Sequence, residues 1–90
     1  MRSAIIITYG KYCNSIGPLI KMWESSESVE DSDEVCRGIG YAQKKLYPKI
    51  FITLKKSKPS QNDLLLILIS MARNQVNDSL NEILFECSNS

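Results

Sequence analysis

Apolar residues in the first quarter of the chain recur at steps of four and three, the spacing that places them on one face of a helix. This face consists of Ile5, Tyr9, Tyr12, Ile16, Leu19 and Trp23. Large aromatic residues in a small domain usually belong to its core, so we expect the two tyrosines and Trp23 to be buried. Gly17 and Pro18 interrupt the pattern, which predicts a kink or a new helix with Pro18 at its first position.

A second helical pattern covers residues 33–47, with an apolar face of Val35, Ile39, Ala42 and Leu46. Gly38 and Gly40 each cost about 1 kcal/mol inside a helix, so we expect them to permit close approach of a neighbouring backbone. Ser32 is the expected N-cap of this helix, and Pro48 is expected to end it.

The last third carries the longest helical pattern. Ser60 stands three residues before Asp63, a variant of the capping box that begins many helices. One apolar face then continues for about six turns. Its members are Leu65, Ile69, Ala72, Val76, Leu80, Ile83 and Cys87. Residues 64–71 are apolar on nearly all sides, which predicts a buried start to this helix. Asn77 and Asp78 leave open whether the pattern is one helix or two.

These patterns predict one domain over residues 1–90 with a mainly α fold, a small bundle of three to five helices. The alternative is an α+β domain with a short two- or three-stranded sheet, in which Ala4–Tyr9 and Lys49–Leu54 pair as strands. With Pro48 at its first position, Lys49–Leu54 would instead form a two-turn helix. Residues 24–34 are predicted to form an acidic, solvated loop or a frayed helix end, and residues 88–90 a polar tail.

Charge is sorted along the chain. The segment 24–34 contains six acids and no base: Glu24, Glu27, Glu30, Asp31, Asp33 and Glu34. The segment 37–58 contains seven bases and no acid: Arg37, Lys44, Lys45, Lys49, Lys55, Lys56 and Lys58. A formal net charge of +1 conceals these two opposed fields, which suit docking to a charged partner.

The residue inventory excludes several kinds of chemistry. The chain has no His, so neither a His-dependent catalytic pair nor a His-containing zinc site can form. Cys13, Cys36 and Cys87 are widely spaced, which predicts buried, reduced side chains in a cytoplasmic protein rather than disulfides or a thiolate cluster. Arg37–Gly40 lacks the third glycine of a phosphate-binding loop, and the apolar block Leu64–Ile69 is too short to span a membrane. We therefore expect no enzymatic activity, no cofactor and no bound metal.

Recognition of a partner remains as the expected function. The acidic segment is predicted to contact a basic surface on another protein, such as the active site of a nuclease toxin. Trp23 and Tyr41 are the candidate aromatic anchors beside it. In size and charge layout the chain resembles bacterial immunity proteins and antitoxins. This resemblance implies an intracellular inhibitor that covers the active site of its toxin.

Two other functions stay open. Lysines alternate with aromatic residues between Lys44 and Lys58, a composition that suits nucleic acid, although the chain as a whole is nearly neutral. The apolar residues 64–71 would instead suit an oligomerising adaptor or structural subunit, a homodimer for example.

Overall fold

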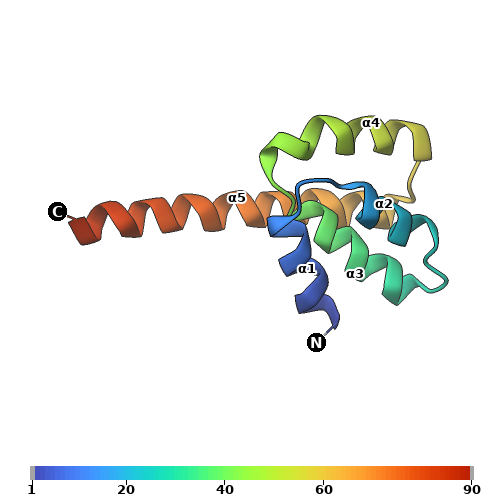
Figure 1. The fold of residues 1–90 in the computed structure, drawn as a ribbon, viewed down its shortest axis with the longest axis horizontal. Helices are drawn as coiled ribbons and strands as arrows, with labels where there is room; N and C mark the ends of the chain where they lie inside the picture. The colour runs from blue at the N-terminus through green and yellow to red at the C-terminus, as the bar shows by residue number, and fades with distance from the viewer. Residues whose placement is uncertain (1, 90) are drawn as a thin grey trace.

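The computed structural model describes residues 2–89, which form five α-helices and one short 3₁₀-helix without a strand (Figure 1). The α-helices are α1 (Arg2–Tyr12), α2 (Gly17–Glu24), α3 (Val29–Gly40), α4 (Tyr47–Ser57) and α5 (Gln61–Asn89). The 3₁₀-helix η1 (Lys44–Leu46) leads into α4. The predicted small helical bundle is confirmed, and both segments proposed as strands are helical.

Helix α3 is the centre of the bundle and packs against α1, α2 and α5. The fully buried large side chains of the core are Ile16, Leu19, Val35, Cys36, Ile39, Ile50 and Ile67. They come from α2 and its approach, from α3, from α4 and from the first half of α5. Val35, Ile39 and Ala42 of the second predicted apolar face are buried and Leu46 is half-buried, but only Val35 and Ile39 lie on α3, because the predicted helix over 33–47 ends at Gly40.

Two glycines bring neighbouring helices close to α3. A Cβ atom added to Gly38 would lie 2.5 Å from Cγ2 of Ile6 in α1. One added to Gly40 would lie 2.7 Å from the carbonyl oxygen of Ile67 in α5. Neither position has room for a side chain, which confirms that these glycines permit close backbone approach.

The start of α3 differs from the prediction. Ser28, not Ser32, is the N-cap, and its hydroxyl accepts a hydrogen bond from the backbone N–H of Asp31 at 3.1 Å. Glu30 and Asp31 then lie in the first helical turn, where acids favour the helix dipole. The predicted acidic loop over residues 24–34 is therefore wrong, since only residues 25–28 connect α2 to α3.

The two prolines near helix starts occupy the same position. Pro18 lies in the first turn of α2, as one alternative predicted, and Pro48 lies in the first turn of α4. Proline is tolerated there because the missing N–H would have no partner within the helix. The prediction that Pro48 ends the preceding helix is wrong, because α3 already ends at Gly40.

The apolar face predicted for α1 is also wrong. Ile6 and Gly10 face the core, whereas Tyr9 and Tyr12 are 45% and 75% exposed. The reason is a glycine contact: a Cβ atom added to Gly10 would collide with the backbone of Gly38. The side of α1 that carries Gly10 therefore faces α3, and the tyrosine side faces solvent.

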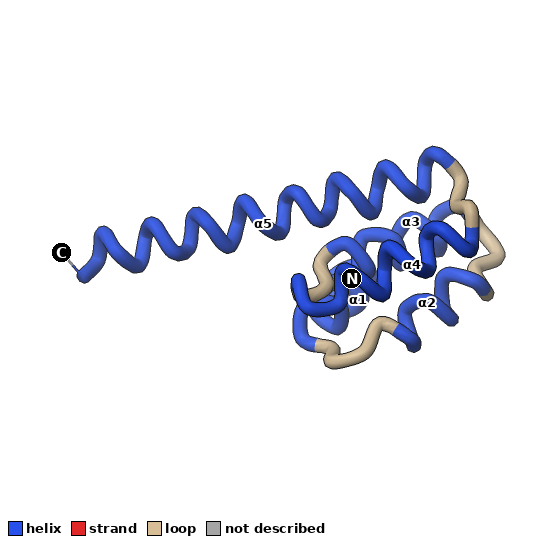
Figure 2. The backbone as a smooth tube through the Cα atoms, turned by 90° about the horizontal axis from the view of Figure 1, so that it is seen from above, coloured by secondary structure: helices blue, strands red, loops and turns tan. Residues whose placement is uncertain are grey.

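Helix α5 continues through Asn77 as one helix of 29 residues. Ser60 caps it as predicted, accepting a hydrogen bond from the backbone N–H of Asp63 at 3.2 Å. The second half of α5 extends beyond all other described helices (Figures 1 and 2). We call residues 2–74 the head and residues 75–89 the arm.

The polar tail predicted for residues 88–90 belongs in part to this helix. Ser88 and Asn89 are its last residues, and Ser90 lies outside the described residues. None of the helices within residues 2–89 combines the length and the apolar content needed to cross a lipid bilayer.

Candidate protein-interaction surfaces

One side of α5 packs on the head. Ile67, Ser70 and Met71 are buried there, beside the close contact with Gly40. The other large apolar residues of the segment 64–71 are less covered: Leu65 is 50% exposed, for example. The prediction that this segment is buried on all sides is therefore wrong.

Asn74 joins α5 to the segment that follows α3. Its side-chain Nδ2 donates to the carbonyl oxygens of Tyr41 and Ala42, each at 3.4 Å. One and two turns further on, the same side of α5 carries Asp78 and Asn81, both exposed. The packing face of the helix thus becomes polar for two turns where the head ends, and Phe85 is the apolar residue that follows on it, 69% exposed.

An apolar face continues along the opposite side of α5. We call it the apolar stripe: Leu65, Ile69, Ala72, Val76, Leu80, Ile83 and Cys87. At about 100° per residue, this stripe lies roughly opposite Ile67 and spans about 33 Å of helix. Val76, Leu80 and Ile83 are 57%, 52% and 56% exposed. The stripe therefore passes from head to arm as one uncovered surface.

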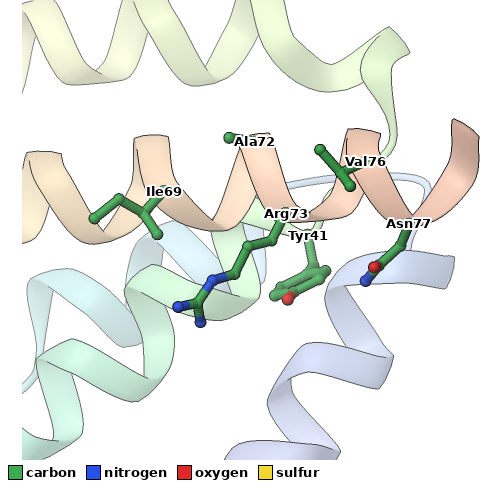
Figure 3. Close-up of a pocket in the computed structure, with 6 residues that line it drawn as sticks. All are labelled: Tyr41, Ile69, Ala72, Arg73, Val76 and Asn77. Atoms are coloured by element: carbon green, nitrogen blue, oxygen red, sulfur yellow. The ribbon is translucent and has the colours of Figure 1, made fainter. Parts of the chain in front are cut away.

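Tyr41 lies beside this stripe. It lines a hollow of about 340 Å³ together with Ile69, Ala72, Arg73, Val76 and Asn77 (Figure 3). The side chain of Ala72 leaves space there because it is a single methyl group. On another side, the Lys11 ammonium lies 5.4 Å from the centre of the Tyr41 ring, a cation–π contact that holds the ring in place. The predicted anchor Tyr41 is thus adjacent to an apolar surface.

The head and the arm carry opposite net charge. Residues 1–74 hold all eleven bases and seven of the ten acids, which leaves +4. Residues 75–90 hold the other three acids, Asp78, Glu82 and Glu86, and no base, which leaves −3. This division was not recognised in the sequence, although a count by helix would have revealed it.

The acids predicted to form a contact surface divide into two groups. Glu24, Glu27 and Glu30 are exposed, whereas Asp31, Asp33 and Glu34 are half-buried. Asp33 is directed toward α5, where Nδ2 of Asn62 donates to its Oδ1 at 3.0 Å. Part of the acidic segment therefore serves the contact between α3 and α5.

Asp63 joins three helices. Its Oδ2 accepts hydrogen bonds from Nε1 of Trp23 at 3.0 Å and from the hydroxyl of Ser32 at 3.1 Å. Trp23 is half-buried, and its Nε1–H is hydrogen-bonded within the fold. Trp23 therefore has a structural role, and its role as an anchor for a partner stays a prediction. Sequence reasoning assigned Asp63 only to the helix start.

A shallow hollow of about 550 Å³ lies between the α2–α3 connection and the start of α5. Its lining residues are Ser26, Glu27, Ser28, Val29, Ser32, Asp33, Ser60, Asn62 and Asp63. This set holds three acids and no base, so the electrostatic potential in the hollow is negative. Such a surface suits the basic side chain of a protein partner.

The basic residues gather on η1 and α4. Lys44, Lys45, Lys49, Lys55 and Lys56 are exposed on these elements. Between them, Phe51 is 43% exposed and makes an edge-on contact with Tyr47, with ring centres 6.1 Å apart. Helix α4 thus presents lysines around one accessible aromatic ring.

Two of the three cysteines are buried as predicted, Cys13 and Cys36, whereas Cys87 in the arm is exposed. Burial, and next the negative charge of Asp63, raise the pKa of the Cys36 thiol to about 12. This thiol is therefore protonated and unreactive at neutral pH. Within the described residues, no three His, Cys, Asp or Glu side chains come together to hold a metal ion.

Comparison of the chain with protein-family models, with curated proteins and with solved structures found no match.

Proposed function

We propose that this protein is a non-enzymatic interaction subunit, an adaptor that docks a protein partner along the apolar stripe of α5. The observation that carries the proposal is the exposure of the stripe over its whole length, from Leu65 on the head to Cys87 on the arm. Monomeric proteins seldom expose continuous apolar surfaces of this kind, and those that do mostly use them for binding.

The geometry of the stripe matches a common mode of recognition, in which an amphipathic helix lies against the apolar surface of a partner. Complete burial of a Val, Leu or Ile side chain stabilises a complex by about 1.5–3 kcal/mol. Residues that are already half-covered, such as Leu80 and Ile83, gain about half of this. Tyr41 beside the stripe supplies an aromatic side chain, a residue type enriched among those that dominate binding energy.

The test is affinity capture from the native host with the tagged wild type and two variants. Leu80→Asp with Ile83→Asp places charge in the stripe, whereas Phe85→Asp places it on the same exposed arm outside the stripe. We expect the stripe variant to lose a specific protein that both other forms retain. Capture of the same proteins by all three forms contradicts the proposal.

A second candidate function is inhibition of a basic protein, such as a nuclease toxin, through the acidic surface. The observation that favours it is the negative hollow beside α3, with Glu24, Glu27 and Glu30 exposed nearby. Charges arranged in this way accelerate association and orient the partner. The half-buried Asp33 belongs to the fold and is left unchanged in its test.

The test replaces Glu24, Glu27 and Glu30 by Gln and measures the affinity of the captured protein at about 50 mM and about 300 mM salt. We expect weaker binding with a smaller dependence on salt. The control replaces Asp78 and Glu82 in the arm by Gln, which removes acid charge outside this surface. Unchanged affinity in the first variant contradicts the inhibitor function without affecting the stripe proposal.

A further inference from the structure

We infer that the occupant of the apolar stripe is a second copy of this chain, whose α5 lies antiparallel to the first with the two-fold axis at Val76. The inference rests on the proposed function in taking the stripe as the docking surface. It adds the identity of the partner, the direction of its helix and the register of the pair.

The spacing of the stripe is symmetric about Val76. Ala72 and Leu80 lie four residues before and after it, Ile69 and Ile83 seven, and Leu65 and Cys87 eleven. A two-fold axis at Val76 therefore places each stripe residue opposite a stripe residue of the second copy, as a self-complementary dimer interface requires. The repeat of eleven residues is close to the natural period of a helix, so two such helices stay in contact along their length with little supercoiling.

Two of the paired positions combine a large side chain with a small one. Leu80 of the second copy falls opposite Ala72, where the hollow of about 340 Å³ lies beside Tyr41 and Arg73 (Figure 3). In the same register, Cys87 falls opposite the larger Leu65. A hollow that remains open in the single chain is thus filled by a leucine of its neighbour.

Charge selects the antiparallel direction. Glu82 and Glu86 lie on the flank of α5 that also carries Leu64 and Leu68. Helix α4 adjoins this flank, because Lys55 and Phe51 line one hollow with Leu64 and Leu68. In an antiparallel pair like flanks meet, so the acidic arm of each copy approaches the basic α4 of the other. A parallel pair would instead bring two arms of charge −3 together.

The shape of the head leaves room for this neighbour. Figure 2 shows α5 along one edge of the molecule, with the other helices of residues 2–89 on its inner side. The stripe faces away from Ile67 and therefore away from the core. The arm of a second copy can lie along the outer side of α5 without displacing any described helix.

Sedimentation of the purified chain tests whether it pairs with itself. Between about 1 µM and about 200 µM, the range over which weak dimers form, we expect the mass to rise from 10.2 kDa to twice that value. Leu80→Asp should shift the dissociation constant at least tenfold, and Phe85→Asp should leave it unchanged. A monomer at every concentration overturns the inference. The proposed function then stands or falls separately, on stripe-dependent capture of a different protein.

Cysteine cross-linking tests direction and register, since Cys13 and Cys36 are buried and Cys87 is exposed. Under mild oxidation, Leu65→Cys should produce a dimer linked between residues 65 and 87, identified by the mass of the joined peptides. The wild type, with Cys87 alone on the arm, should stay unlinked. A dimer linked through two Cys87 residues in the wild type indicates a parallel pair, and absence of the 65–87 bridge excludes the register; either result overturns the inference.

A charge exchange tests the contact between the arm and α4. Glu86→Lys should weaken the dimer severalfold, and adding Lys55→Glu to the same chain should restore it. The matched control is Lys21→Glu, which reverses the charge of an exposed base on α2 that has no part in this contact. Failure of Lys55→Glu to restore the dimer overturns the assigned contact.

Discussion

The two halves of α5 have very different surroundings. In the head, Ile67 and Met71 are buried against α3, and Gly40 lets the two backbones approach. In the arm, Ile83 and Leu84 are 56% and 63% exposed. One continuous helix therefore has a first half stabilised by tertiary packing and an exposed second half, of which only the first turns border hollows shared with the head.

The first half is the more apolar, with eight apolar residues in 61–74 against six in 75–89, and the halves also differ in which face is apolar. The face that packs on the head carries the polar Asn74, Asp78 and Asn81 and then the single exposed Phe85, whereas the stripe on the other side continues to Cys87. The arm is patterned to bury a surface against something other than its own head.

The largest expected effect compares two isoleucines on this helix. Ile67→Ala should lower the free energy of unfolding by about 2–5 kcal/mol, because it leaves a cavity in the core. Ile83→Ala should change it by less than about 0.5 kcal/mol in dilute monomer, because its site is exposed. Urea unfolding followed by the fluorescence of Trp23, the single tryptophan, measures both. Equal losses would contradict the division into head and arm.

The next effect concerns the contact that holds the first half of α5. Gly40→Ala should lower the free energy of unfolding by about 1–3 kcal/mol, because the added Cβ meets the backbone of α5 and the helices must separate. Gly17→Ala is the matched control, since a Cβ there would lie 3.5 Å from Oγ of Ser15, an ordinary contact. Thermal unfolding followed by circular dichroism compares the two variants. A Gly40→Ala protein as stable as the wild type would show that close packing of α5 against α3 does not depend on this glycine.

Loss of a single hydrogen bond should have a smaller effect. Trp23→Phe removes the donor to Asp63 and should cost about 1–2 kcal/mol, because the bond joins a half-buried indole to a charged acceptor. Tyr12→Phe serves as the control, since Tyr12 is 75% exposed. Thermal unfolding of both variants gives the comparison, and equal melting temperatures would show that the junction at Asp63 contributes little.

The smallest effect is the pH dependence that the buried thiol of Cys36 gives to the stability of the head. The folded protein holds the pKa of Cys36 at about 12, above that of an unfolded thiol, so folding favours the protonated form. This contribution is fully present below about pH 9 and is lost as pH rises toward 12. Between pH 7 and pH 10 it should lower the free energy of unfolding by about 1 kcal/mol.

The measurement is urea unfolding at both pH values. Cys36→Ala should remove this part of the pH dependence, whereas Cys87→Ala in the exposed arm should leave it as in the wild type. If the pH dependence is the same in Cys36→Ala as in the wild type, the buried thiol does not contribute to it.

Sequence reasoning succeeded where the local structure depends on residues that are close in the sequence. The cap at Ser60 and the helix start at Pro18 follow from local backbone chemistry, and the structure has both. It failed for α1, because the choice between the tyrosine side and the Gly10 side is made by Gly38, far along the chain. Sequence reasoning also placed the N-cap of α3 at Ser32 instead of Ser28. Acidic residues follow each of these two serines, so local chemistry alone does not show which of them caps the helix.

The candidate surfaces show the same limit. Periodicity identified every member of the apolar stripe, but residues 64–71 have apolar side chains on two faces, and only the head determines which face is covered. The acidic segment was recognised by its charge, yet the division between exposed Glu27 and α5-bound Asp33 depends on where Asn62 lies. Tyr41 was chosen as an anchor for the acidic surface and lies instead beside the stripe.

The acids of the arm affect the stability of the last turns of α5. Glu86 lies near the carboxyl end of α5, where the helix dipole is already negative, and the last turn holds no base to offset it. With no tertiary packing, the final turns therefore depend mainly on intrinsic helix propensity, which is marginal in so short a segment. A cationic surface placed against the arm removes this repulsion at the same moment as it covers the stripe. Docking and helix formation then become a single equilibrium, and helical ellipticity should increase as the arm is occupied.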